Sequence, residues 1–392
     1  MKEIVIAGMA RTAIGDFQSA FKDVSAVELG KAAAAAAMER AQIRPEDVED
    51  CVTGMVYKAG AKGNPSRQIQ LELSIPEKVV ATTIEQQCAS SMRALEVVVQ
   101  QIQLGLVETG LVTGIESMSR VPYLMLNARG GFRMGDSVVS DGLMYDALYD
   151  AFLNYHMGLT AETLADEYAI TREEQDRWAF ISHKRAIAAM EKGWYKEEIV
   201  PYVVKSRKGE AVIHTDEHPK SDISEESLAK LKPAFKKDGT VTAGNASGVN
   251  DGGSAMVVMS AEKADALGVK PIARILSTAS YGVKPEVMGI GPVHVIPLAL
   301  ERAGKTMKDM DYFEINEAFA AQFLACRKVL DIPEDLINAR GSGISLGHPV
   351  GSTGLRLIIS TIQELKQRGG RLGVASLCAG GGPAMATVVE IL

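Results

Sequence analysis

Residues 79–115 read VVATTIEQQCASSMRALEVVVQQIQLGLVETGLVTGI and predict a strand, a helix and a second strand in succession. Residues 79–85 and 111–115 are short runs rich in β-branched side chains, and residues 90–104 form a longer, helix-like segment between them. This alternation is typical of parallel strands joined by crossover helices.

The alternation extends in both directions along the chain and resumes after Pro271. Further strands are predicted at residues 4–7, 51–56, 272–277, 312–315, 372–377 and 386–391, and further helices at residues 25–41, 292–303, 317–330 and 353–368. An offset of 260 residues places residues 111–115 opposite 371–375, and Cys88 opposite His348. We therefore expect a duplicated α/β fold in which both halves contribute to one active site.

The alternation of strand-like and helix-like segments is interrupted between Ser119 and Val249. Helices are predicted there at residues 160–168 and 172–192, followed by a charged region around residues 205–237, before a strand at 255–259 and a helix at 261–267 return to the first pattern. We predict an N-terminal half formed by residues 1–118 and 250–270, an inserted loop domain of residues 119–249, and a C-terminal half of residues 271–392.

The amino-acid composition and charge argue against a nucleic-acid-binding or membrane-spanning protein. Of 392 residues, 46% are hydrophobic and 23% charged, as in an ordinary soluble protein. The formal net charge of −7, without a Lys/Arg block, argues against a nucleic-acid partner. No apolar run reaches the roughly 18 residues that a membrane span needs, and the first residues enter a strand pattern without a signal peptide. We expect a cytoplasmic protein.

The cysteines and histidines are not arranged for metal binding or disulfide bonding. The four cysteines form no C-x-x-C pair, and the six histidines form no H-x-x-x-H motif. We therefore expect neither a metal site nor a disulfide framework.

Cys88 is the first candidate for chemistry, because it lies between a predicted strand and a predicted helix. A thiol at a helix N-terminus meets unpaired N–H groups and the positive end of the helix dipole, which lower its pKa and favour the nucleophilic thiolate. The position alone fits a small buried apolar residue better, because that is what most free cysteines are.

His348 is the second candidate, in the segment Gly347-His348-Pro349-Val350-Gly351 before a predicted helix. Glycines let a backbone approach a ligand closely, and a histidine there can act as the base for Cys88. The alternative is a turn histidine that makes only a backbone contact.

Two further segments follow predicted strands. Cys378 precedes Ala379 and three glycines, whose successive N–H groups can form an oxyanion hole, although a plain tight turn is the alternative. Asn316 follows the strand at 312–315, where it fits a helix N-cap without a catalytic role.

Taken together, these segments resemble the thiolase family, in particular its short-chain acetyl-CoA acetyltransferases. The resemblance covers essentially the whole chain and is carried, in the family's order, by residues 11–15, 63–68, 116–123, 155–162, 241–248, 316–320, 347–351 and 378–382. It implies a thiolase-like α/β fold: duplicated βαβαβαββ halves in a layered α/β/α/β/α core, with a large inserted loop domain.

The resemblance also implies a reaction, the reversible condensation of two acetyl-CoA molecules to acetoacetyl-CoA and coenzyme A. Cys88 would accept the acetyl group, His348 would activate it, and Cys378 would remove the α-proton of the second acetyl-CoA. Asn316, through a water, and His348 would bind the thioester oxygen. The N–H groups of Cys88 and Gly380 would form a second oxyanion hole.

Eight positions match the family's coenzyme A site, mostly on the inserted domain: His156, Met157, Lys220, Ser227, Phe235, Ala243, Ser247 and Phe319. Coenzyme A is then substrate and product, and no separate cofactor is implied. The chain departs from the family pattern at Ser91, where many members have glycine, and at Lys220, which is often arginine over the adenine. Lys220 cannot stack as a planar guanidinium does.

Residues 126–143 resemble the loop by which short-chain members join two dimers into a tetramer; the alternative is a plain surface loop.

The second candidate activity is a 3-ketoacyl-CoA thiolase of β-oxidation, but Met157 and Met288 favour a short acyl pocket. A decarboxylating ketosynthase lacks the C-terminal Cys-x-Gly-Gly-Gly, so Cys378 argues against it. A further alternative is a catalytically inactive protein that only binds acyl-CoA or serves as a scaffold. Such a protein would not need the four catalytic residues, so their presence argues against it.

Overall fold

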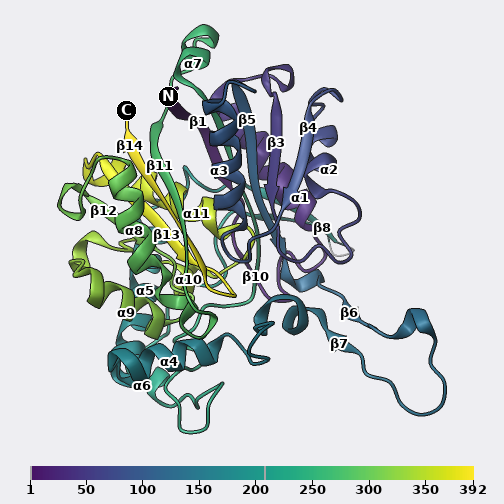
Figure 1. Cartoon of the computed structure of the whole chain (residues 1–392), viewed down its shortest axis with the longest axis vertical. Coiled ribbons are helices and arrows are strands. Elements are labelled where there is room, and N and C mark those ends of the chain that lie inside the picture. Colours follow the sequence, from purple (N-terminus) through teal and green to yellow (C-terminus); the bar gives the residue numbers. More distant parts are fainter. Residues whose placement is uncertain (1, 207–208) are drawn as a thin grey trace.

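The computed structural model, which describes residues 2–206 and 209–392, is built around a ten-stranded sheet (Figure 1). The strand order is β12–β13–β14–β11–β1–β10–β5–β3–β4, and the short β2 (Gly15–Asp16) pairs with β10. The two ends of this order come from opposite ends of the chain, and β1 and β11 join them in the middle through antiparallel pairs such as Ile4 with Ile275.

Each half of the sheet is built by one half of the chain. The N-terminal half contains β1 (Ile4–Arg11), α1 (Ala26–Ala41), β3 (Asp50–Gly54), α2 (Pro65–Glu72), β4 (Val80–Ile84), α3 (Ser90–Gln103), β5 (Thr109–Ser117), β10 (Asn250–Ser260) and α7 (Ala261–Leu267). The C-terminal half contains β11 (Ala273–Gly282), α8 (Gly291–Arg302), β12 (Tyr312–Ile315), α9 (Ala320–Leu330), α10 (Gly343–Leu346), α11 (Thr353–Arg368), β13 (Leu372–Cys378) and β14 (Pro383–Ile391).

The two halves repeat one topology, as expected. In the first, β3 is parallel to β5, and β5, β10 and β1 follow in antiparallel pairs; in the second, β12, β13, β14 and β11 repeat these relations. A parallel bridge between Phe313 and Ile337 stands where β4 pairs with β3 in the first half. The expectation of parallel strands therefore applies to β3, β4 and β5 in the first half and to β12 and β13 in the second, because the remaining strands of both halves pair antiparallel.

The layers follow from the alternation of side chains along the strands. Ile4 and Ile6 of β1 face a core that contains α3 and α11, whereas Val5 and Ala7 face α1. On the C-terminal half, α8 and α9 cover the outer face. The result is the expected α/β/α/β/α order, with α3 and α11 in the centre, packed against strands of both halves (Figure 1).

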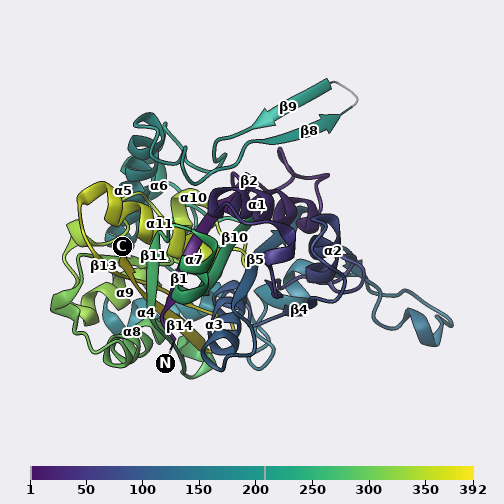
Figure 2. The same cartoon turned by 90° about the horizontal axis from the view of Figure 1, so that it is seen from above.

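The segment between β5 and β10 leaves the sheet and returns to it. It contains β6 (Tyr123–Leu124), β7 (Ser140–Asp141), α4 (Gly158–Tyr168), α5 (Arg172–Glu191), β8 (Tyr202–Ser206), β9 (Gly209–Ile213) and α6 (Glu225–Ala229). Figure 2 shows that the β8–β9 hairpin projects from the body of the molecule. Two residues of the charged region singled out in the sequence, 207 and 208, lie outside the described residues.

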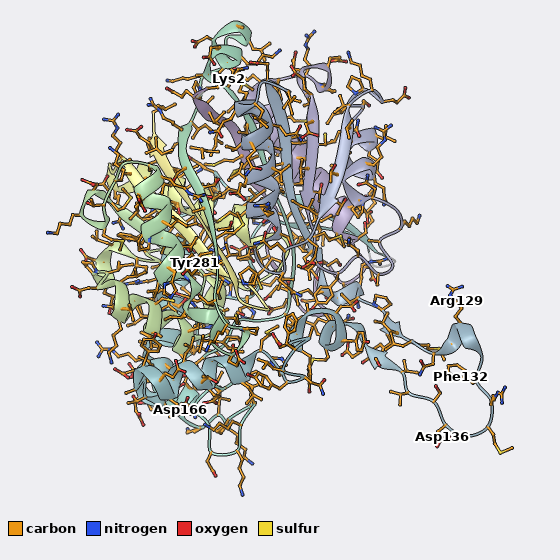
Figure 3. The ribbon with its side chains drawn as sticks, in the orientation of Figure 1. Lys2, Arg129, Phe132, Asp136, Asp166 and Tyr281 are labelled. Atoms are coloured by element: carbon orange, nitrogen blue, oxygen red, sulfur yellow. The ribbon has the colours of Figure 1, made fainter. Side chains whose placement is uncertain are left out.

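An arm formed by residues 126–139 projects from the paired β6 and β7. Figure 3 shows Arg129, Phe132 and Asp136 on it, away from the rest of the chain. Met134 is fully exposed, and Val138 is 78% exposed. Apolar side chains in such positions are unusual for a segment that meets only solvent.

Several boundaries differ from the sequence-based expectations. The helix predicted at residues 317–330 begins only at Ala320, and α2, β8, β9 and α6 were not predicted. By contrast α1 begins as expected, because Ser25 forms a capping box with Glu28. Throughout the described ranges, every helix is too short or too polar to serve as a membrane span.

Candidate active site

The N-terminal ends of α3 and α11 lie directly against each other. A Cβ on Gly354 would come within 2.7 Å of the backbone nitrogen of Met92 and 2.9 Å of Ser91 Oγ, so this approach needs glycine. Cys88 precedes α3 and His348 precedes α11. The packing of these two helices therefore brings two segments that are 260 positions apart in sequence to the same end of one helix pair.

Cys88 is partly exposed and packs against an apolar cluster that includes Val56, Tyr57 and Val350. Burial raises the pKa of its thiol to about 12, while the backbone N–H groups of Gly380 and of Cys88 itself act in the opposite direction. The expected low pKa is thus contradicted for the resting protein, because loss of hydration outweighs the helix terminus. The thiol needs a base to lose its proton.

His348 is held in one tautomer by its neighbours. Thr353 Oγ1 donates to the carbonyl oxygen of Pro349 at 3.0 Å and therefore accepts from His348 Nδ1, 2.7 Å away. Nε2 then carries the free lone pair and lies 3.3 Å from Asn316 Nδ2. Burial, and next the charge of Arg356, lower the pKa of His348 to about 3, so the imidazole is a neutral base at physiological pH.

Asn316 is not a helix N-cap, contrary to the simplest interpretation of its sequence position. The cap of α9 is Phe319, and the backbone N–H of Asn316 instead donates to the carbonyl of Ser376 on β13 at 3.0 Å. Its fully buried amide faces His348. A Cβ on Gly343 would come within 2.7 Å of Asn316 Oδ1, so a glycine is needed behind the amide.

Cys378 is the buried last residue of β13. Burial raises the pKa of its thiol well above the ordinary range, and the next cause is Cys88, so the two sulfurs are near enough to influence each other. The chain then turns through Gly381 (φ 81°) and Gly382 (φ 106°), a conformation that favours glycine. This turn places Gly380 against Met157 and Gln87, the residue before Cys88.

An aromatic row leads to this site. The rings of His156 and Phe235 stack at 4.4 Å, and the Phe319 ring meets Phe235 edge-on at 6.1 Å. Met157 and Phe319 belong to the same buried cluster as Cys378. Four of the eight residues predicted for coenzyme A therefore gather beside a predicted catalytic sulfur.

Three of the other four line a pocket of about 240 Å³. Lys220, Ser227 and Ala243 line it, together with His183 and His218, which the sequence analysis did not single out. Ala246 also lines this pocket and bridges to Phe319. Ser247, the next residue, donates its backbone N–H to Ala318 at 2.9 Å. Ala246 thus connects the lining of the pocket to the aromatic row.

Three residues that touch this machinery were missed as site residues: Thr353, Arg356 and Glu116. Oε2 of the buried Glu116 accepts the N–H groups of Val56 and Gly351, each at 3.0 Å, and so ties the loop after β3 to the loop that carries His348. Burial raises the pKa of Glu116 to about 8. No sequence spacing signals such a contact, because it joins positions 235 residues apart.

Comparison with known proteins agrees with this geometry. A family model described as the N-terminal domain of thiolase matches residues 4–262, and one described as the C-terminal domain of thiolase matches residues 269–391. An acetyl-CoA acetyltransferase of Chromobacterium violaceum is 45% identical over 389 residues, which are 99% of each chain.

Solved structures are similar along the whole chain. The structure of an acetyl-CoA acetyltransferase from Syntrophomonas wolfei superimposes with a TM-score of 0.98 at 45% identity and covers all of both chains. Human mitochondrial 3-ketoacyl-CoA thiolase superimposes with a TM-score of 0.97 at 38% identity, covering 100% of this chain and 99% of the human one.

Proposed function

Because this chain belongs to the thiolase family and is therefore an acyltransferase, we propose that it is an acetyl-CoA acetyltransferase, which reversibly joins two acetyl-CoA molecules into acetoacetyl-CoA and coenzyme A. The observation that carries this proposal is the meeting of two thiols and a neutral imidazole around the paired starts of α3 and α11. Its full-length relatives at 43–45% identity include several acetyl-CoA acetyltransferases.

In the first half-reaction, Cys88 Sγ attacks the thioester carbon of acetyl-CoA. His348 Nε2 takes the thiol proton as the sulfur–carbon bond forms, and gives it to the coenzyme A sulfur as that bond breaks. The N–H groups of Cys88 and Gly380, which already act on the sulfur, are suited to stabilise the oxyanion. Acetyl-Cys88 and free coenzyme A result.

In the second half-reaction, His348 Nε2 takes the proton of the Cys378 thiol, and the Cys378 thiolate then removes an α-proton from a second acetyl-CoA. The carbanion attacks the acetyl carbon on Cys88, a carbon–carbon bond forms and the Cys88 thioester breaks. The proton on His348 then passes to the Cys88 thiolate, which restores both thiols and the neutral imidazole. Burial raises the pKa of the Cys378 thiol, and a thiolate of higher pKa is the stronger base.

Coenzyme A would lie along the aromatic row and the adjoining pocket. His156, Met157, Phe235 and Phe319 would contact the pantetheine arm, with Ser247 beside it, and Lys220, Ser227 and Ala243 would surround the adenine end. Coenzyme A is consumed and released in the reaction, so no separate cofactor is needed.

The acyl chain is the point on which the two candidate activities differ. Met157 and Met288 are buried in the cluster beside Cys378, which supports a short pocket. Coenzyme A-dependent thiolysis of 3-ketoacyl-CoA substrates of increasing length tests this directly. We expect activity on acetoacetyl-CoA that falls as the chain lengthens; activity that rises with length would instead support a 3-ketoacyl-CoA thiolase of β-oxidation, and none on any substrate would overturn both.

We also propose a homotetramer held together through the arm of residues 126–139, and a cytoplasmic location. Exposed apolar side chains on the arm, such as Met134, support the first proposal. Light scattering after size-exclusion chromatography of the full chain, and of a chain with the arm shortened, would distinguish a tetramer from a dimer.

A further inference from the structure

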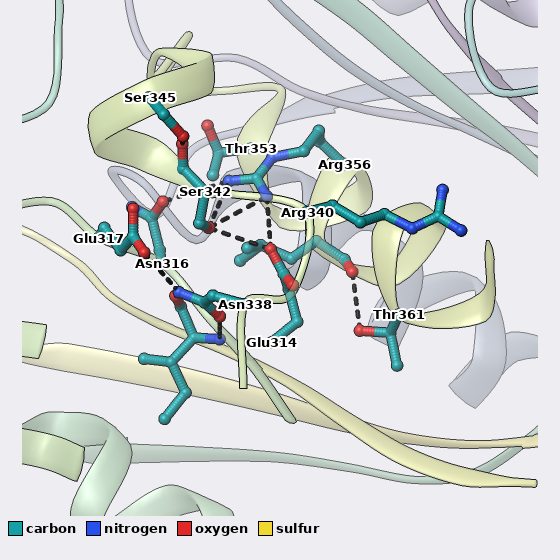
Figure 4. Close-up of polar contacts among 12 residues, drawn as sticks. Glu314, Asn316, Glu317, Asn338, Arg340, Ser342, Ser345, Thr353, Arg356 and Thr361 are labelled. Atoms are coloured by element: carbon teal, nitrogen blue, oxygen red, sulfur yellow. Dashed lines mark hydrogen bonds and ion pairs between the residues drawn. The ribbon is translucent and has the colours of Figure 1, made fainter. Parts of the chain in front are cut away.

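We propose that Arg356 is a positioning residue for this reaction, whose guanidinium turns the amide of Asn316 so that its NH₂ group faces His348. Figure 4 shows the guanidinium of Arg356 with the side chains of Ser342 and Glu314. The inference rests on the proposed function and adds a residue that would touch neither substrate nor the reacting atoms. Arg356 lies on α11, one helical turn beyond Ser352, and is 1% exposed.

The guanidinium is held by a set of acceptors around it. Nη1 donates to Glu314 Oε1 at 2.9 Å, and both Nη1 and Nη2 lie 3.2 Å from Ser342 Oγ. Nη2 also donates to Asn316 Oδ1 at 3.4 Å. Glu314 is on β12, and Asn316 is the residue directly after this strand, so β12 positions both the counter-charge of Arg356 and the amide that it contacts.

This contact determines which end of the amide enters the site. The oxygen and nitrogen of an asparagine amide are similar in size, but arginine has only donors. Only Oδ1 can therefore face Arg356, and Nδ2 must face His348 Nε2, where it donates at 3.3 Å. If the amide turned over, its oxygen would meet the lone pair of Nε2 and the site would lose a donor for the thioester oxygen.

The same charge acts on His348. Burial is the main cause of its lowered pKa, and the Arg356 charge adds to it. Other titratable groups on the elements packed around this loop are Glu314 behind Arg356, Glu317 after β12, Glu116 on β5, Cys88 before α3 and Cys378 on β13. Glu314 partly neutralises Arg356, and burial raises the pKa of Glu314 to about 7.

Arg340 offers a matched control, because it is also a buried arginine in ion pairs. It lies 2.9 Å from Glu364 and 3.1 Å from Glu198, and its remaining described bonds go to the backbone oxygens of Trp194 and Gln363. A purely structural role for Arg356 would make the two arginines equivalent in their effect on the reaction.

The test compares Arg356→Gln, Arg356→Lys and Arg340→Lys in the full chain, by thiolysis of acetoacetyl-CoA from pH 5 to 9. For Arg356→Gln we expect kcat to fall about 10- to 100-fold with little change in KM, since one oriented oxyanion donor is worth ~10²–10³ in kcat. In the unchanged protein the acid limb of the kcat/KM profile should lie below pH 5, because the pKa of His348 is about 3. In Arg356→Gln it should move up into the measured range, because His348 becomes easier to protonate. Arg356→Lys keeps the charge and should restore the acid limb, but not all of kcat.

Arg340→Lys should leave the acid limb where it is in the unchanged protein. The inference would be overturned if the kcat/KM profile of Arg356→Gln matched that of the unchanged protein. It would also be overturned if the acid limb of Arg340→Lys moved as far as that of Arg356→Gln. If the Arg356 variants do not fold, a neutron structure of the unchanged protein, which distinguishes the amide nitrogen from the oxygen, remains decisive: Asn316 Nδ2 facing His348 would support the inference, and Oδ1 facing His348 would overturn it. Absence of thiolysis by the unchanged protein would contradict the proposed function instead.

Discussion

The hydroxyl oxygen of Ser91 on α3 accepts a hydrogen bond from the backbone N–H of Leu355 on α11, at 3.1 Å. Leu355 lies in the first turn of α11, where N–H groups have no partner within the helix. The sequence predicts only that Ser91 makes the start of α3 less open than the glycine of many thiolases. In the structure this serine caps the other central helix, and so links the segment that carries Cys88 to the one that carries His348.

Replacing Ser91 by alanine should therefore destabilise the protein. The change leaves the buried N–H of Leu355 without its acceptor, which costs about 1–3 kcal/mol. Urea unfolding measures the difference, with the exposed Ser221→Ala as the control, expected within about 0.5 kcal/mol of the unchanged protein. Equal stability of the two variants would show that the Ser91–Leu355 bond contributes nothing.

A buried ion pair joins the inserted segment to β1. Asp216 lies 2.8 Å from Nη1 and 3.0 Å from Nη2 of Arg11, and both side chains are almost completely buried. Asp216→Asn leaves Arg11 with the carboxylate of Glu198, 2.9 Å from Nε, and should cost about 1.5–3 kcal/mol in the free energy of unfolding. Asp166→Asn breaks an exposed pair with Lys236, which solvent screens, and should leave the free energy of unfolding nearly unchanged. Similar losses in both variants would contradict this view of the Arg11 pair.

Replacing the two catalytic cysteines one at a time should separate the two half-reactions. With radiolabelled acetyl-CoA, Cys378→Ala should retain protein-bound acetyl label but form no acetoacetyl-CoA, whereas Cys88→Ala should form neither. Cys51→Ala, which changes a buried cysteine on β3, is the control and should do both. Normal condensation by Cys378→Ala would mean that another group removes the α-proton.

His183 should make the fold sensitive to acid. Burial lowers its pKa to about 3, while the unfolded chain takes up this proton near pH 6.5. Below pH 6.5 the unfolded state therefore binds more protons, so stability is lost as the pH falls from about 6.5 towards 3. The melting temperature should drop less between pH 7.5 and 5 in His183→Asn, which can still accept the backbone N–H of Lys220. An identical drop would mean that His183 titrates normally when folded.

Local patterns in the sequence determined most of the elements and the identity of the main candidates. The predicted bounds of β12, α7 and α11 match the structure to the residue. Side-chain periodicity and caps act over a few neighbouring residues, so they can be read without the fold. Cys88, His348 and Cys378 stood out in the same way, because each is a reactive side chain beside glycines or at the end of a predicted strand.

Only the tertiary structure decided how those side chains behave. Cys88 was expected to have a low pKa because it precedes a helix, yet the surrounding packing raises it. Asn316 looked like a helix cap, yet it bonds to residues of β13 and α11. The roles of Glu116, Thr353 and Arg356 were not visible in the sequence. Desolvation and amide orientation depend on which atoms surround a group, and here those atoms come from distant parts of the chain that only folding brings together.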